Sequence, residues 1–176
     1  DIMFTYSQRL VWPNSCSYVA ILTNLSNLIG KQLNVHDMNI WYNEVWSNGR
    51  WALVNTTTIN RVLDWFNKYY KQNIKLEMST ITWALKRIKK WEMGYIWFRW
   101  NRESAYDFQI DGIINQCPKG QMEWWHSCNL IYRDGKFVLI DNYKWERQHN
   151  EYIVSEEILN EMIKNKIIRW TCYFFR

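Results

Sequence analysis

The dipeptide Asp134-Gly135 constrains the fold of this chain most strongly, because it separates two runs of strand-forming residues. The first run, WWHSCNLIY at 124–132, and the second, KFVLIDNY at 136–143, are rich in aromatic and aliphatic residues. Asp-Gly between two such runs is a strong sequence signal for a tight β-hairpin turn. We therefore predict an antiparallel hairpin over 124–143.

Two further segments have the composition of strands. YIWFRW at 95–100 and RWTCYFF at 169–175 combine aromatic with β-branched residues, which strands favour. Segment 101–123 is polar and has no periodic pattern, so we expect a long loop there. The second half of the chain is thus expected to form an antiparallel sheet, with a short helix capped by Ser155 before its last strand.

The first half of the chain has helical periodicity. Apolar residues at helical spacing predict a helix that begins at Cys16 and ends at Gly30. A second helix is expected with Asn34 as its cap, a third over roughly 58–71, and a fourth that ends at Gly94.

Helices followed by an antiparallel sheet indicate an α+β domain. The 176 residues are expected to form a single domain, 1–176, with a helical part over about 1–93 and a β-rich part over about 94–176. Hydrophobic residues make up 48% of the chain, with only 6 Gly and 2 Pro, which excludes a disordered tail.

The charge of the chain limits its partners only loosely. A net charge of +5 permits contact with nucleic acid without making it obligatory. The densest basic run, KRIKK at 86–90, is expected to be a solvated helix face. No stretch approaches the roughly 18 consecutive apolar residues of a membrane span, so no span is expected. The start at Asp1, without a signal-peptide pattern, suits a processed product or a domain cut from a longer protein.

The cysteines favour a reducing compartment. We expect a soluble protein of the cytoplasm, or a part of a viral or phage particle or of a polyprotein. The 4 cysteines, at 16, 117, 128 and 172, have no CxxC spacing, which favours free thiols. Cys128 is expected to fill the core and Cys117 to lie in a loop. Cys117, His126 and Cys128 match no standard zinc-ligand spacing, so neither a metal nor a cofactor is expected.

His126 is the histidine with the most informative neighbours. His36 and His149 lie in polar segments and are expected at the surface. A turn centred at residue 134 places His126 and Asn142 opposite each other, with Cβ atoms about 4.5–5.5 Å apart. Strand alternation then puts Asp141 on the other face, unless a bulge shifts the register. We therefore expect Asn142 to orient the imidazole of His126.

Cys16 is the candidate nucleophile, with a buried structural thiol as the alternative. At a helix start, the helix dipole and unpaired N–H groups favour a thiolate, and a neighbouring protonated histidine favours it further. Such a thiolate attacks a carbonyl carbon, and the resulting oxyanion needs preorganised donors. The backbone N–H of Cys16 and the side-chain amide of Gln8 are the candidate donors, with Asn14 as an alternative to Gln8.

These segments resemble those of papain-like cysteine peptidases. The order Cys, His, Asn along the chain matches that family. HSCNLIYRDGKFVLIDN at 126–142 aligns without a gap to the family's His-to-Asn hairpin, and SCSYVAIL at 15–22 resembles its nucleophile helix. TWALKRIKKWEMGYIWF at 82–98 is similar to the helix and strand that precede the His strand in papain-like and bacteriocin-processing peptidases.

The resemblance implies a papain-like α+β fold, in which a helical half packs against an antiparallel sheet or half-barrel with the active-site cleft between them. It implies a thiol protease, an endopeptidase that cleaves a protein or peptide substrate through a thioacyl-enzyme at Cys16. His126 would be the general acid and base, Asn142 the orienter and Gln8 the oxyanion donor. An amidase or an isopeptidase would use the same residues.

A second class of function is a papain-like fold without activity, which serves as a binding or structural module in a virion or on nucleic acid. The family's glycines around the cysteine are replaced here by Asn14, Ser15 and Ser17. Gln8 also lies farther from Cys16 than in the family pattern. These departures keep the binding module open beside the hydrolase.

Overall fold

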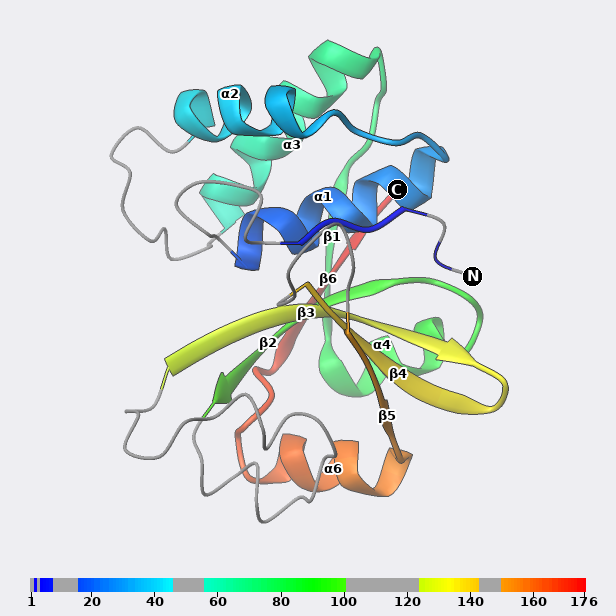
Figure 1. Ribbon diagram of the computed structural model, residues 1–176. Coiled ribbons are helices and arrows are strands. Elements are labelled where there is room, and N and C mark those ends of the chain that lie inside the picture. The colour runs from blue at the N-terminus through cyan, green and yellow to red at the C-terminus, as the bar shows by residue number, and fades with distance from the viewer. Residues whose placement is uncertain (1, 3, 8–15, 46–55, 101–123, 143–149) are drawn as a thin grey trace. The chain divides into compact units, whose positions relative to one another are not determined.

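The chain divides into two units. Unit 1 comprises Asp1–Glu77, Asn142–His149 and Phe174–Arg176, and unit 2 comprises Met78–Asp141 and Asn150–Tyr173. The computed structural model in Figure 1 describes residues 2, 4–7, 16–45, 56–100, 124–142 and 150–176.

Unit 1 contains the first three predicted helices, which are confirmed as α1 (Cys16–Ile29), α2 (Val35–Val45) and α3 (Thr56–Tyr70). Every residue of α1 from 18 to 26 is buried, so α1 is a core helix rather than an amphipathic surface helix. Helices α2 and α3 lie side by side in Figure 1 and pack through aromatic rings. The Trp41 ring lies 3.9 Å from that of Trp65, centroid to centroid.

The ends of these helices follow the predicted capping residues. Gly30 has a φ of +67°, and the N–H of Lys31 donates to the carbonyl of Ser26 at 3.0 Å, which is a glycine-based C-cap. Asn34 Oδ1 accepts a hydrogen bond from the N–H of His36 at 2.8 Å. His36 is exposed, as predicted.

The strands join in one sheet in the order β1-β6-β2-β3-β4-β5. Their bounds are β1 (Leu76–Thr80), β2 (Gly94–Trp100), β3 (Trp124–Arg133), β4 (Lys136–Asp141), β5 (Asn150–Val154) and β6 (Thr171–Phe175). The pairs β6-β2, β2-β3, β3-β4 and β4-β5 are antiparallel. Helices combined with an antiparallel sheet confirm the α+β class.

The structure adds two short strands that the sequence did not predict, β1 and β5. Strand β5 shows the alternation of a half-buried strand over only a few residues, since Tyr152 and Val154 are buried and Ile153 is exposed. The helix after it, α6 (Glu156–Lys164), is capped as predicted, because Ser155 Oγ accepts from the N–H of Ile158 at 3.1 Å.

The predicted hairpin is confirmed as the β3-β4 pair. Asp134 has a φ of 54° and Gly135 a φ of 75°, the two positive values that a type I′ turn requires. Arg133 pairs with Lys136 across the turn, and Asn129 pairs with Ile140 farther along. The turn is therefore centred between Asp134 and Gly135, half a residue later than expected.

Helix α4 (Ile81–Ile88) ends earlier than predicted, and Gly94 is not its end. The chain turns after α4 at Trp91, whose φ is +76°, and Gly94 begins β2. A Cβ atom at Gly94 would lie 2.8 Å from Cys172 Sγ and 2.8 Å from Ile88 Cδ1. Glycine is needed there because the side chains of Ile88 and Cys172, which belong to other elements, pack directly against its Cα atom. The division of the chain also places α4 in unit 2, whereas the sequence grouped it with the first helices.

We expect Gly94→Ala to lower the free energy of unfolding by about 1–3 kcal/mol, because the added methyl group overpacks this contact. Urea denaturation measures the change. Ile88→Val removes the Cδ1 atom that the methyl would meet, so the double variant should lose less stability than the sum of the single variants. Strictly additive losses would contradict this explanation.

Among the helices in the described segments, none combines the length and the apolar character needed to cross a membrane.

Candidate functional site

A buried imidazole–carboxylate pair lies on the hairpin of unit 2. His126 is in β3, and Asp141 is the last residue of β4. His126 Nε2 lies 2.8 Å from Asp141 Oδ1, and the two side chains are only 12% and 3% exposed. A bond this short between largely desolvated groups holds the imidazole ring in one orientation.

The predicted pairing of His126 with Asn142 is corrected by the register of the hairpin. Continuing the pairs from Asn129 and Ile140 places Asp141 opposite Cys128. His126 is two residues before Cys128 on the same face of β3, so His126 and Asp141 are diagonal neighbours. A shift of one residue moves a side chain to the other face of the sheet. Asp141 therefore lies on the face of His126, where Asn142 was expected, and Asn142 lies on the other face.

The sequence contained a signal for this register. In a two-residue Asp-Gly turn, the residues on either side of the dipeptide pair directly, as Arg133 and Lys136 do. Counting outward from Arg133 and Lys136 puts Asp141, not Asn142, on the face of His126. The prediction instead centred the turn on Asp134.

The His126–Asp141 contact defines which ring nitrogen can exchange protons in a reaction. A carboxylate only accepts hydrogen bonds, so Nε2 carries the hydrogen that it donates to Asp141. Nδ1 is then the basic nitrogen of the neutral ring. Strand β4 pairs with β3 on one side and β5 on the other, which fixes the backbone of Asp141. The arrangement can take a proton at Nδ1 and stabilise the resulting imidazolium.

Asn142 instead belongs to unit 1, where it connects the N-terminal segment 4–7 with α1. Its Nδ2 donates to the carbonyl of Tyr6 at 2.7 Å and contacts Thr23 Oγ1 at 3.1 Å. Asn27 of α1 holds the same segment, because its Nδ2 donates to the carbonyl of Phe4 at 2.6 Å. Asn142 is almost fully buried, so we expect its hydrogen bonds to stabilise the fold.

Asn142→Ala is expected to lower the free energy of unfolding by about 1–3 kcal/mol, because the buried carbonyl of Tyr6 loses its donor. Asn165→Ala is the matched control, since the Asn165 amide donates to the carbonyl of Glu161 at an exposed position. Chemical denaturation of both variants gives the comparison. Equal losses in the two variants would argue against a structural role for Asn142.

Cys16 is the first residue of α1 and is partly exposed. Its Sγ lies 3.9 Å from Ser17 Oγ. Cys128 and Cys172 are buried, and burial raises the pKa of the Cys172 thiol. Cys128 therefore fills the core as predicted, and Cys16 is the described thiol that solvent can reach.

The remaining predicted site residues lie outside the described residues. They are Gln8, Asn14, Cys117 and His149. Cys16 belongs to unit 1 and the His126–Asp141 pair to unit 2. Within the described segments, no three His, Cys, Asp or Glu side chains gather in a way that could hold a metal ion.

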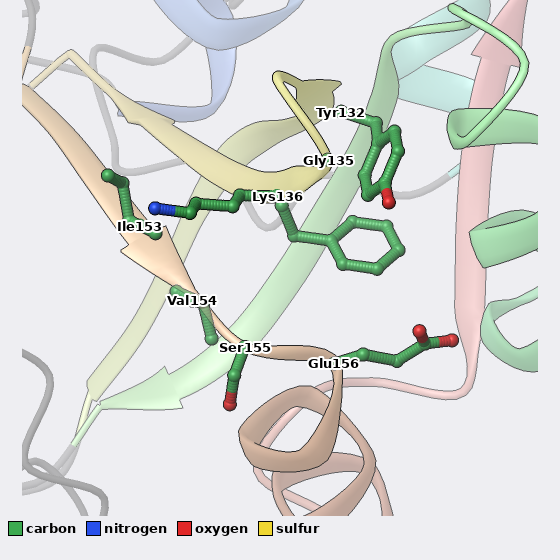
Figure 2. A pocket seen from close by; sticks show the side chains of 8 residues that line it. Tyr132, Gly135, Lys136, Ile153, Val154, Ser155 and Glu156 are labelled. Atoms are coloured by element: carbon green, nitrogen blue, oxygen red, sulfur yellow. The ribbon is translucent and has the colours of Figure 1, made fainter.

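A surface hollow of about 290 Å³ lies elsewhere in unit 2 (Figure 2). It is lined by Tyr132, Gly135, Lys136, Phe137, Ile153, Val154, Ser155 and Glu156. Two of its polar side chains already have partners. Lys89 Nζ binds both carboxylate oxygens of Glu156 at 2.9 Å. Ser155 Oγ caps α6. The lining contains no pair of nucleophile and base, so we do not assign catalysis to this hollow.

Compared with protein-family models, with curated proteins and with solved structures, the chain matches none.

Proposed function

We propose that this chain is a papain-like cysteine peptidase, a thiol hydrolase that cleaves an amide bond in a protein or peptide. The 2.8 Å contact between His126 Nε2 and Asp141 Oδ1 carries the proposal. A buried carboxylate that orients a histidine is the arrangement by which hydrolases of several folds activate a nucleophile. Cys16, at the start of a core helix, is the proposed nucleophile that this histidine would activate.

The proposed papain-like fold assigns the nucleophile to a helical part and the base to an antiparallel sheet. Helix α1 carries Cys16, and strand β3 carries His126. The proposal now gives the orienting role to Asp141 in place of Asn142. The chemistry requires Cys16 and His126 to act on one substrate carbonyl.

In the proposed reaction, His126 Nδ1 takes the proton of the Cys16 thiol, and Sγ forms a bond to the substrate carbonyl carbon. The oxyanion is stabilised by N–H donors, with the Cys16 backbone N–H and the Gln8 amide as candidates. His126 gives its proton to the departing amine as the C–N bond breaks. Water then attacks the thioester, His126 takes a proton from that water, and the Sγ–C bond breaks. The proton returns to the thiol, so the enzyme is regenerated.

Alkylation of the individual cysteines tests this proposal without knowledge of the substrate. The folded protein is treated with a chloroacetamide probe near neutral pH, and peptide mass spectrometry follows the rate at each cysteine. We expect Cys16 to react at least about tenfold faster than Cys16 in the urea-unfolded chain, because a neighbouring imidazole favours the thiolate. Cys172 is the internal control, since its buried thiol should react only after unfolding.

Equal rates at Cys16 in the folded and unfolded chains would exclude the hydrolase and favour a binding module. If Cys16 is activated, peptide anilides, simple amides and isopeptides distinguish an endopeptidase from an amidase and an isopeptidase. Cys16→Ala should abolish hydrolysis of whichever substrate is cleaved.

A further inference from the structure

Three tryptophans around α4 are exposed to an unusual degree. The exposed fractions are 65% for Trp83, 81% for Trp91 and 61% for Trp170. Trp83 lies in the first turn of α4 and Trp91 just beyond its end. The carbonyl of Trp170 accepts a hydrogen bond from the N–H of Ile81 at 2.7 Å, so Trp170 adjoins the start of the helix. Large aromatic rings are normally buried, and several together on a surface mark an interaction site.

The backbone at Trp91 is a second anomaly at the same place. Its φ of +76° is in the left-handed region, which a bulky residue rarely adopts. The other described non-glycine residues with positive φ are Lys71, Asp134 and Lys166, all of them polar. An exposed ring contributes little packing that would offset the strain. The positive φ itself ends α4, because the N–H of Glu92 donates to the carbonyl of Arg87 at 3.4 Å. That turn does not require a tryptophan, whereas a binding surface would use its exposed ring.

Lysines accompany these rings in the sequence, and one of them contacts a ring. Lys86 Nζ lies 4.3 Å from the centroid of the Trp83 ring, and Lys90 lies in the turn that follows α4. Arg87 pairs with Glu92 at 2.8 Å, and Lys89 pairs with a carboxylate of α6. Among the described carboxylates, none forms an ion pair with Lys86 or Lys90. Exposed positive charge thus remains beside exposed indole rings.

We infer that Trp83, Trp91 and Trp170, with Lys86 and Lys90, form a binding surface for single-stranded nucleic acid. Stacking on aromatic rings combined with Lys contacts to phosphates is the way proteins bind single strands without sequence preference. A lipid surface fits less well, because the aliphatic side chains of α4 are buried, so its exposed face has no aliphatic residues to insert into a bilayer. This function is separate from the proposed hydrolase and does not depend on it.

Fluorescence anisotropy with a labelled oligo(dT) of about 12 nucleotides tests the inference in the full chain. We expect Trp83→Ala and Trp91→Ala each to raise Kd about fivefold or more. Trp91→Gly should bind as weakly as Trp91→Ala, yet its Tm should equal or exceed that of the parent, because glycine tolerates a φ of +76°. Weaker binding without lower stability separates a binding role from a folding role.

Salt dependence tests the lysines. Lys86→Gln combined with Lys90→Gln should lower the slope of log K against log salt by about 1.4, since each phosphate contact on a single strand contributes about 0.7. Lys68→Gln combined with Lys164→Gln removes the same charge from exposed positions on α3 and α6 and should leave the slope unchanged.

The inference is overturned if the parent protein does not bind oligo(dT), or if the tryptophan variants bind as well as the parent. Equal slope changes in both lysine pairs would also overturn it, by showing a general charge effect. Binding to phosphatidylserine vesicles without binding to oligo(dT) would assign this surface to a membrane instead.

Discussion

His126→Ala is expected to lower kcat/KM for amide hydrolysis by about 10²–10⁴-fold, because the thiol loses the group that takes and returns its proton. The rate of Cys16 alkylation should fall to that of the unfolded chain for the same reason. Steady-state kinetics on a cleaved peptide and the mass-spectrometric rates measure both effects. The fold should survive, since His126 lies on a strand whose backbone pairing is unchanged.

His36→Ala is the control for this substitution, because His36 is an exposed histidine on α2. It should leave both the hydrolysis and the alkylation rates at the parent values. If His126→Ala retained rapid alkylation of Cys16, another base would have to activate the thiol, and the proposed roles would be wrong.

Asp141→Ala is expected to have the second-largest effect, a fall in kcat/KM of about 10²-fold or more, because His126 loses the carboxylate that orients its ring. The loss should be mainly in kcat, since the substrate does not bind Asp141 in the proposed reaction. Asp141→Asn should restore part of the activity, because an amide oxygen can accept the hydrogen bond from Nε2.

This series also distinguishes Asp141 from Asn142. Asn142→Ala should reduce stability while the activity of the folded fraction remains close to that of the parent. A larger loss of activity in Asn142→Ala than in Asp141→Ala would return the orienting role to Asn142. Failure of Asp141→Asn to recover any activity would indicate that the carboxylate acts through its charge rather than through orientation.

Much of the fold was predictable because the signals are local. Gly30 ends a helix and Ser155 begins one, and the hydrogen bonds at both ends join residues only a few positions apart. The sequence predicted both helix ends. Asp134 and Gly135 form the turn that their dipeptide favours. The secondary structure that carries two of the candidate site residues was predictable for the same reason. Helical periodicity placed Cys16 at a helix start, and strand composition placed His126 in a strand.

The prediction was wrong where a detail depends on distant residues or on the register of a strand. Gly94 looked like a helix end, but its lack of a side chain accommodates Cys172 and Ile88 from other elements. Asn142 looked like a partner for His126, but its amide donates to Tyr6 near the start of the chain. Neither contact leaves a pattern in the neighbouring sequence.

The helices, the central hairpin and the α+β class follow from local signals, because capping, turn formation and apolar periodicity act over a few residues. The contact of Asp141 with His126 and the exposure of Trp83 and Trp91 appear only in the folded chain. Strand neighbours and burial are set by packing between residues that are far apart in the sequence. A register difference of one residue leaves the composition unchanged but reverses the face of every side chain in the strand.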